Sequence, residues 1–125
     1  MENFKIEKTK STPSVILNYI TGECEIRGSS YPENAREYYE PVFKWLNDFM
    51  LQITSEISFT FNLDYLNSSS IKIVSDLVEV LNNYGKAGIK VSINWYYSED
   101  DDDIKELGEE FRDEVECLFN LIRNN

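Results

Sequence analysis

The stretch from residue 57 to residue 81 changes its hydrophobic period, and this change most constrains the fold. Up to Leu63 apolar and polar residues alternate, which is the period of a half-buried β-strand. From Ile71 onward apolar residues recur every three or four positions, which is the period of an amphipathic α-helix. The apolar positions are Ile57, Phe59, Phe61 and Leu63, and then Ile71, Val74, Leu77, Val78 and Leu81. A strand over 57–63 is therefore followed by a helix over about 69–84.

The hydroxyl groups of Ser68, Ser69 and Ser70 fall where this helix begins. A helix N-terminus presents unpaired N–H groups and the positive end of the helix dipole, so it suits an added phosphate group. A simpler role is also open, because Asn and Ser are preferred helix-capping residues and either Asn67 or Ser68 suits the cap position. The pattern alone favours the capping role.

The same periodicities predict the remaining elements. Strands are expected over 14–19, 23–27 and 90–97, with a turn at Thr21-Gly22, and helices over about 38–53 and 101–121. Pro41 either kinks the first helix or lies in the first turn of a helix that starts there, and Gly85 or Gly88 closes the second. The last helix takes its apolar face from Ile104, Leu107, Phe111, Val115, Leu118 and Ile122.

The predicted class is therefore α/β, in the order β-β-α-β-α-β-α. The strands alternate, whereas strands buried on both faces read as continuous apolar runs. We expect one mixed sheet with the helices on one face and a second, open face that carries polar side chains. No linker or repeat divides the 125 residues, so a single domain over 1–125 is expected.

The chain is strongly acidic, with a net charge of −11. Such a field argues against nucleic acid and against anionic membrane surfaces as partners. No run approaches the length of a transmembrane helix, and the N-terminus lacks the apolar run of a signal peptide, so a cytoplasmic location is expected. Cys24 and Cys117 lie among apolar neighbours and are expected to be reduced core thiols.

The sequence contains no histidine and no glycine-rich phosphate loop. This excludes nucleophiles activated by histidine and metal sites that contain histidine, so we expect no catalytic residues and no cofactor. The four consecutive acids from Asp100 to Asp103 lack the spacing and the glycine of a calcium-binding EF-hand, and they suit a helix N-terminus instead. An enzyme that uses clustered carboxylates with a divalent ion stays as an alternative.

An acidic segment from Glu99 to Glu116 carries most of the net charge. It is either a solvated helix face or a docking surface for a basic partner. Among the aromatic residues that end the fourth strand, Trp95 and Tyr97 are expected in the core, whereas Tyr96 points the other way and is a candidate anchor for a partner. The candidate partner-binding residues are Tyr65, Tyr96, Asp101, Asp102 and Glu106.

Several blocks together resemble the SiaC family of bacterial regulatory phosphoproteins. They are the sequence SYPENA from Ser30, the sequence YEPVFKWL from Tyr39, the sequence DYLNSSS from Asp64, and Trp95-Tyr96-Tyr97 with the acids that follow. The resemblance runs from about Ser11 to Phe119. It implies a fold similar to that of anti-sigma-factor antagonists, the STAS-like fold, which agrees with the open mixed sheet expected above.

The resemblance also implies a partner switch without catalysis of its own. A cognate kinase phosphorylates the protein, a PP2C-type phosphatase reverses this, and the unmodified form activates a diguanylate cyclase linked to biofilm control. The phosphoacceptor of the family falls on Ser68, where serine replaces the usual threonine, and the adjacent Ser69 and Ser70 remain alternatives. Asn67 and Lys72 are the expected phosphate environment. A scaffold protein that uses only the open sheet face is the third functional hypothesis.

Overall fold

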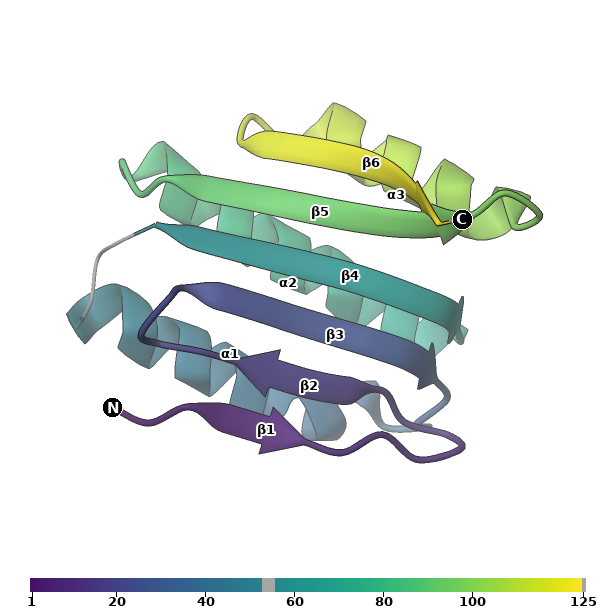
Figure 1. Ribbon diagram of the computed structural model, residues 1–125, viewed down its shortest axis with the longest axis horizontal. Coiled ribbons are helices and arrows are strands. Elements are labelled where there is room, and N and C mark those ends of the chain that lie inside the picture. Colours follow the sequence, from purple (N-terminus) through teal and green to yellow (C-terminus); the bar gives the residue numbers. More distant parts are fainter. Residues whose placement is uncertain (53–55, 125) are drawn as a thin grey trace.

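The computed structural model describes residues 1–52 and 56–124 and contains one mixed sheet with three helices (Figure 1). The predicted α/β class is confirmed. The observed order is β-β-β-α-β-α-β-α-β, which has one more strand at each end than the predicted order. The elements are β1 (Phe4–Ile6), β2 (Ser14–Leu17), β3 (Glu23–Ser30), α1 (Ala35–Gln52), β4 (Ile57–Leu66), α2 (Ser68–Lys86), β5 (Val91–Ser98), α3 (Asp102–Glu114) and β6 (Leu118–Asn124).

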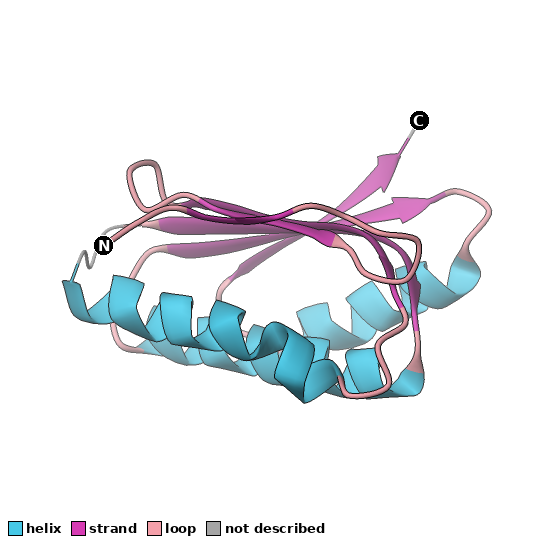
Figure 2. Cartoon of the chain, turned by 90° about the horizontal axis from the view of Figure 1, so that it is seen from below, coloured by secondary structure: helices cyan, strands magenta, loops and turns pink. Residues whose placement is uncertain are grey.

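The strands lie in the sheet in the order in which they occur in the sequence. β1, β2 and β3 pair antiparallel, whereas β3, β4, β5 and β6 pair parallel through three helical crossovers. Such crossovers are almost always right-handed, so crossovers that all advance in the same direction place their helices on the same face. Figure 2 shows all three helices below the sheet and none above it, as the alternating strands predicted.

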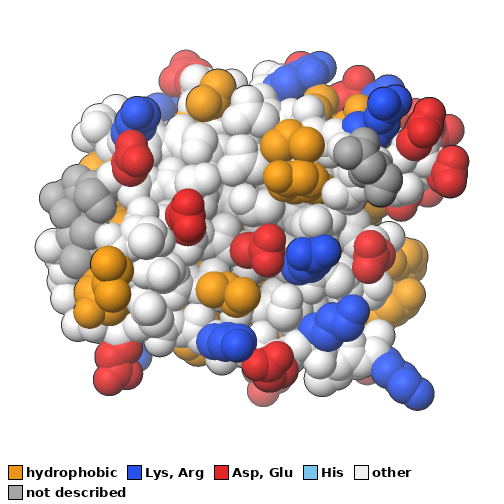
Figure 3. Space-filling model, viewed as in Figure 1, with side chains coloured by type: hydrophobic (Ala, Val, Ile, Leu, Met, Phe, Trp, Pro, Cys, Tyr) orange, Lys and Arg blue, Asp and Glu red, His pale blue; other side chains and the backbone are white. Residues whose placement is uncertain are grey.

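The open face of the sheet is polar, and most of its surface in Figure 3 is uncharged side chain and backbone. Asn94 at its centre donates hydrogen bonds from Nδ2 to Ser58 Oγ at 3.0 Å and to Thr60 Oγ1 at 3.3 Å. Asn120 Nδ2 donates to Asn94 Oδ1 at 3.0 Å. These bonds join side chains of β4, β5 and β6, so these four polar side chains pair with one another across the strands.

The hydrophobic core fills the space between the sheet and the helices. Phe59, Phe61 and Trp95 are almost completely buried, and the ring of Phe61 contacts the rings of the other two. Trp95 therefore lies in the core as predicted, and its Nε1 donates a hydrogen bond to the carbonyl oxygen of Ile104. Tyr97 is half-buried and packs against the core from its edge.

The prediction of a helix up to residue 121 is wrong. α3 ends at Glu114, Val115 is extended, and Leu118–Asn124 forms the edge strand β6 parallel to β5. The side chain of the buried Asn82 accepts hydrogen bonds from the backbone N–H groups of Glu116 and Cys117, at 2.9 and 3.2 Å. This contact with α2 satisfies the backbone where the chain leaves the helix.

The structure decides the two helix boundaries that the sequence left open, one at Pro41 and one at Gly85 or Gly88. α1 runs continuously from Ala35 to Gln52, so the alternative of a helix that starts at Pro41 is wrong. Pro41 lies on the exposed side of α1, where a carbonyl group that loses its N–H partner remains accessible to water. α2 ends before Gly88, whose φ of 101° is a left-handed conformation that suits glycine, and this decides between the two predicted closing glycines.

Cys24 and Cys117 are both free thiols, Cys24 buried and Cys117 half-buried. Over the described ranges, no helix has both the length and the apolar character that crossing a membrane requires.

Candidate phosphorylation and partner-binding site

The predicted serine block lies at the edge of the sheet where parallel strands end and helices begin. β3 ends at Ser30 before α1, β4 ends at Leu66 before α2, and β5 ends at Ser98 before α3. In parallel sheets this carboxyl edge is the usual location of binding sites, because the loops that follow the strands meet there.

Asn67 is the N-cap of α2. Its backbone is extended, with φ −76° and ψ 172°, and its Oδ1 accepts a hydrogen bond from the N–H of Ser70 at 2.8 Å. Its Nδ2 donates to the carbonyl oxygen of Pro32 at 3.2 Å, and its own N–H donates to the carbonyl oxygen of Ser30 at 3.0 Å. Of the two residues predicted as caps, Asn67 therefore takes the role, and it also ties the start of α2 to the end of β3.

Ser70 is completely buried and belongs to a chain of hydroxyl groups. Its Oγ lies 2.7 Å from Ser30 Oγ and donates to the carbonyl oxygen of Ser30 at 3.2 Å. Ser30 Oγ in turn lies 2.7 Å from the hydroxyl oxygen of Tyr39, a fully buried residue of α1. Burial raises the pKa of Tyr39 to about 12, so its phenol is neutral at physiological pH. Modification of Ser70 would require this packed network to open.

Ser69 is half-buried and faces α1. Its Oγ accepts a hydrogen bond at 3.3 Å from the backbone N–H of Ala35, the first residue of α1. The first N–H groups of a helix have no partner within the helix, so Ser69 satisfies one of them from outside. The hydroxyl of Ser69 therefore has a structural role at the contact between two helix N-termini.

Ser68 is the first residue of α2 and the exposed one of the three serines. Within residues 1–52 and 56–124, no side-chain hydrogen bond of the structure involves its hydroxyl. Lys72 lies one turn further along α2 and is also exposed, and residues four apart on a helix share a face. The hydroxyl of Ser68 is thus accessible at the positive end of the α2 dipole, with the cationic side chain of Lys72 one turn away.

Two exposed tyrosines lie at the same edge of the sheet, where β3 and β4 end. The rings of Tyr31 and Tyr65 stack with centroids 4.6 Å apart, and each side chain remains almost half exposed. A bulge at Asp64 produces this arrangement, because Gly28 pairs with Leu63 whereas Ser29 pairs with Tyr65. The extra residue exposes Tyr65 and returns the next residue to the core.

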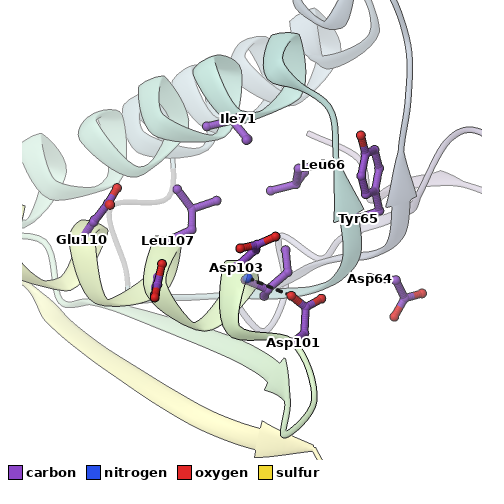
Figure 4. A pocket seen from close by; sticks show the side chains of 10 residues that line it. Asp64, Tyr65, Leu66, Ile71, Asp101, Asp103, Leu107 and Glu110 are labelled. Atoms are coloured by element: carbon purple, nitrogen blue, oxygen red, sulfur yellow. Dashed lines mark hydrogen bonds between the residues drawn. The ribbon is translucent and has the colours of Figure 1, made fainter.

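A groove lies between the N-terminal parts of α2 and α3, with a volume of about 440 Å³ (Figure 4). We call it the α2–α3 groove. It combines apolar and acidic side chains. Its lining residues are Asp64, Tyr65, Leu66, Ile71, Asp101, Asp103, Ile104, Glu106, Leu107 and Glu110.

The predicted partner-binding residues lie in three places, and three of the five line the α2–α3 groove. Tyr65, Asp101 and Glu106 line the α2–α3 groove, and Asp101 Oδ1 also accepts a hydrogen bond from the N–H of Ile104 as the N-cap of α3. Asp102 is exposed on α3 but does not line the groove, and Tyr96 is half-buried on β5 opposite Ile122 of β6.

Tyr31 and Ile71 belong to the same exposed surface and were missed from the sequence. In the sequence, Tyr31 looks like an ordinary loop residue because it precedes a proline. Ile71 looks like an ordinary core residue because it fits the helical apolar pattern. In the structure both are substantially exposed, at 46% for Tyr31 and 36% for Ile71. Over the described ranges, no group of three or more acidic or thiol side chains is arranged to hold a metal ion.

The sequence model of the SiaC family of regulatory phosphoproteins matches residues 6–124. The chain belongs to the SiaC family. A curated relative, an uncharacterized protein of Pseudomonas aeruginosa strain UCBPP-PA14, is 34% identical over 119 residues, which are 95% of this chain and 93% of the relative. The resemblance drawn from the sequence blocks is thereby confirmed.

Solved structures of SiaC from Pseudomonas aeruginosa have the same fold as this SiaC-family chain. One matches with a TM-score of 0.92 and 31% identity, over 99% of this chain and 100% of the other. Apo-SiaC matches with a TM-score of 0.90 and 33% identity, over 98% and 99%. SiaC in complex with the diguanylate cyclase SiaD, of which it is the activator, matches with a TM-score of 0.91 and 31% identity, over 97% and 99%.

Proposed function

We propose that this chain is a partner switch without catalytic activity, controlled by reversible phosphorylation of Ser68. In the unmodified state it binds and activates a diguanylate cyclase, a cognate kinase phosphorylates it, and a PP2C-type phosphatase restores it. The observation that carries the proposal is that Ser68 alone among the three serines has an exposed hydroxyl, whereas Ser69 and Ser70 are hydrogen-bonded to other elements. The SiaC complex with its cyclase supports the class of target.

Phosphorylation at this position changes the surface and leaves the fold intact. A phosphate group on Ser68 adds about −1.5 to −2 charges at pH 7 at the positive end of the α2 dipole. The helix dipole and the side chain of Lys72 stabilise it there. A target surface that buries the neutral hydroxyl would then have to bury a dianion, which is costly unless the target supplies a matching cation.

The hydroxyl of Ser68 has no role in catalysis on a substrate in this proposal, so the chain acts only through the proteins that it binds. A cytoplasmic location and a link to c-di-GMP signalling in biofilms belong to the same proposal. The scaffold alternative predicts binding that does not respond to phosphorylation, and the metal-dependent alternative predicts turnover that a carboxylate substitution abolishes.

Phosphopeptide mapping after incubation with the cognate kinase tests the acceptor. Phosphate should appear on Ser68 in the wild type and in a Ser69→Ala control, and it should be absent from Ser68→Ala. Phosphate that persists in Ser68→Ala on Ser69 or Ser70 would show that the acceptor is assigned to the wrong serine.

A binding titration against the cyclase tests the switch. Ser68→Asp should bind at least about 30-fold more weakly than the wild type, because mispairing of a buried charge costs on the order of 2–5 kcal/mol. Ser68→Ala should bind like the wild type and should no longer respond to the kinase. Equal affinity of the cyclase for phosphorylated and unmodified protein would end the switch hypothesis.

A further inference from the structure

The α2–α3 groove has an apolar floor that is incompletely covered. Leu66 and Ile104 are buried at its base, Leu107 of α3 is half-buried, and Ile71 of α2 is 36% exposed. Figure 4 shows Ile71 and Leu107 directed from their two helices toward the space between them. A groove between two helices with apolar side chains on both walls is the form of surface that accepts the apolar face of a further helix.

The rim of the groove is uniformly acidic. Its carboxylates are Asp64, Asp101, Asp103, Glu106 and Glu110. In the part of the chain that the structure describes, none of these five lies within ion-pair distance of a lysine or arginine, although five ion pairs form elsewhere. The like charges repel one another, and a cationic occupant would relieve this repulsion.

This charge distribution also selects against other occupants. A second copy of the chain carries a net charge of −11 and would be repelled from the groove. A nucleotide or another phosphate ester would place further negative charge against the five carboxylates. A cationic partner, by contrast, is steered toward the groove and binds it faster at low ionic strength.

We infer that the α2–α3 groove is the docking site for a cationic amphipathic helix of a partner protein. The helix places apolar side chains, spaced three and four residues apart, between Ile71 and Leu107. Lysine and arginine side chains that flank its apolar face then meet Glu106 and Glu110 on the α3 side and Asp64 on the β4 side. This mode of recognition combines apolar contact at the floor with charge pairing at the rim.

This docking site is distinct from the proposed switch. Ser68 does not line the groove, although Ile71 follows it by one turn of α2. An added negative charge at Ser68 attracts a cationic helix, whereas the proposed switch requires the same charge to release the cyclase. The groove and the switch therefore respond to a charge at Ser68 with opposite signs, and one can fail without the other.

A synthetic amphipathic helical peptide, with leucines on one face and lysines on either side, is the probe. Its affinity for the wild type, measured by fluorescence anisotropy, should fall as NaCl is raised. The double variant Glu106→Gln/Glu110→Gln should bind it at least about fivefold more weakly. The matched control Glu114→Gln/Glu116→Gln removes the same charge from exposed positions outside the groove and should bind within about twofold of the wild type. Equal weakening of both variants would overturn the inference, because net charge alone would then explain binding.

The apolar floor is tested by a second matched pair. Ile71→Ala should weaken binding of the peptide roughly tenfold, because its side chain forms one wall of the groove. Ile20→Ala removes the same atoms from a residue that is 73% exposed in the turn between β2 and β3, and it should leave the affinity unchanged. An unchanged affinity of Ile71→Ala, with a thermal melt like that of the wild type, would exclude the groove as the binding site.

Two further outcomes decide the nature of the site. Ser68→Asp should bind the peptide as tightly as the wild type or more tightly, and weaker binding would contradict the separation of groove and switch. Displacement of the peptide by Mg²⁺ at constant ionic strength, with loss of Mg²⁺ binding in Glu106→Gln/Glu110→Gln, would identify a cation site and overturn the proposal of a helix-docking groove.

Discussion

Replacement of Ser30 by alanine should destabilise the protein more than replacement of either hydroxyl group that it contacts. The hydroxyl of Tyr39 is fully buried, and within the described residues Ser30 Oγ is its hydrogen-bond partner at 2.7 Å. Ser30→Ala leaves this phenol without a partner, which costs about 1–3 kcal/mol in the free energy of unfolding. For a chain of 125 residues, each kcal/mol lowers the melting temperature by about 3–5 °C.

The two neighbouring hydroxyl groups can be removed at lower cost. Ser70→Ala leaves Ser30 Oγ bonded to Tyr39 and the carbonyl oxygen of Ser30 bonded to the N–H of Asn67. Tyr39→Phe likewise leaves Ser30 Oγ bonded to Ser70. Each of these variants loses a hydrogen bond but leaves no buried polar group without a partner at this contact. A loss of about 0.5–1.5 kcal/mol in the free energy of unfolding is therefore expected.

The double variant Ser30→Ala/Tyr39→Phe tests this reasoning most directly. It removes both members of the contact, so it should be more stable than Ser30→Ala alone even though it carries one more substitution. Urea unfolding of the four variants and the wild type measures the free energies, with Ser68→Ala as a surface control within about 0.5 kcal/mol of the wild type. If the double variant loses as much stability as the two single variants together, the hydroxyl of Tyr39 has another partner and the proposed network is wrong.

Three further effects on stability are expected. Asn67→Ala should cost about 1 kcal/mol in urea unfolding, since it removes the N-cap of α2. Gly108→Ala should cost about 1–3 kcal/mol and change the tryptophan emission, because an added Cβ would overlap the ring of Trp95. Burial raises the pKa of Cys24 from 9.0 and that of Tyr39 from 10.0, each to about 12. As the pH rises, both groups therefore lose their protons in the unfolded chain before they lose them in the folded protein. Stability should therefore be retained below pH 9 and fall between pH 9 and 12, and a flat unfolding midpoint across that interval would contradict this.

The sequence predicts the centre of the fold better than its two ends. The strands β2 to β5 and the helix α2 have strong single periods, and the structure has each of them within a few residues of the predicted bounds. The last strand was predicted as helix because Val115, Leu118 and Ile122 continue the spacing of α3, while Leu118–Asn124 is also short enough for a strand. The contact that ends α3 comes from Asn82, which is distant in the sequence, so no local signal marks it.

The candidate site shows the same division between local and distant causes. The helix start and its serines are local features, and they were predicted from the change in period. The separate roles of Ser69 and Ser70 depend on α1 and on the end of β3, which only the folded chain brings beside them. The exposure of Ile71 likewise depends on how far α3 lies from α2, which the helical pattern does not encode.

The order of the strands has a consequence for how the chain is built during synthesis. Every strand pairs with the strand that precedes it, so the sheet can grow at one edge as residues leave the ribosome. The pairing of β4 with β3 brings the serines of α2 to Ser30, and β5, α3 and β6 are not needed for that contact. The acceptor segment is thus assembled early, whereas the acidic wall of the groove comes from α3 and arrives later. A nascent chain would present the hydroxyl of Ser68 before it presents a complete docking groove.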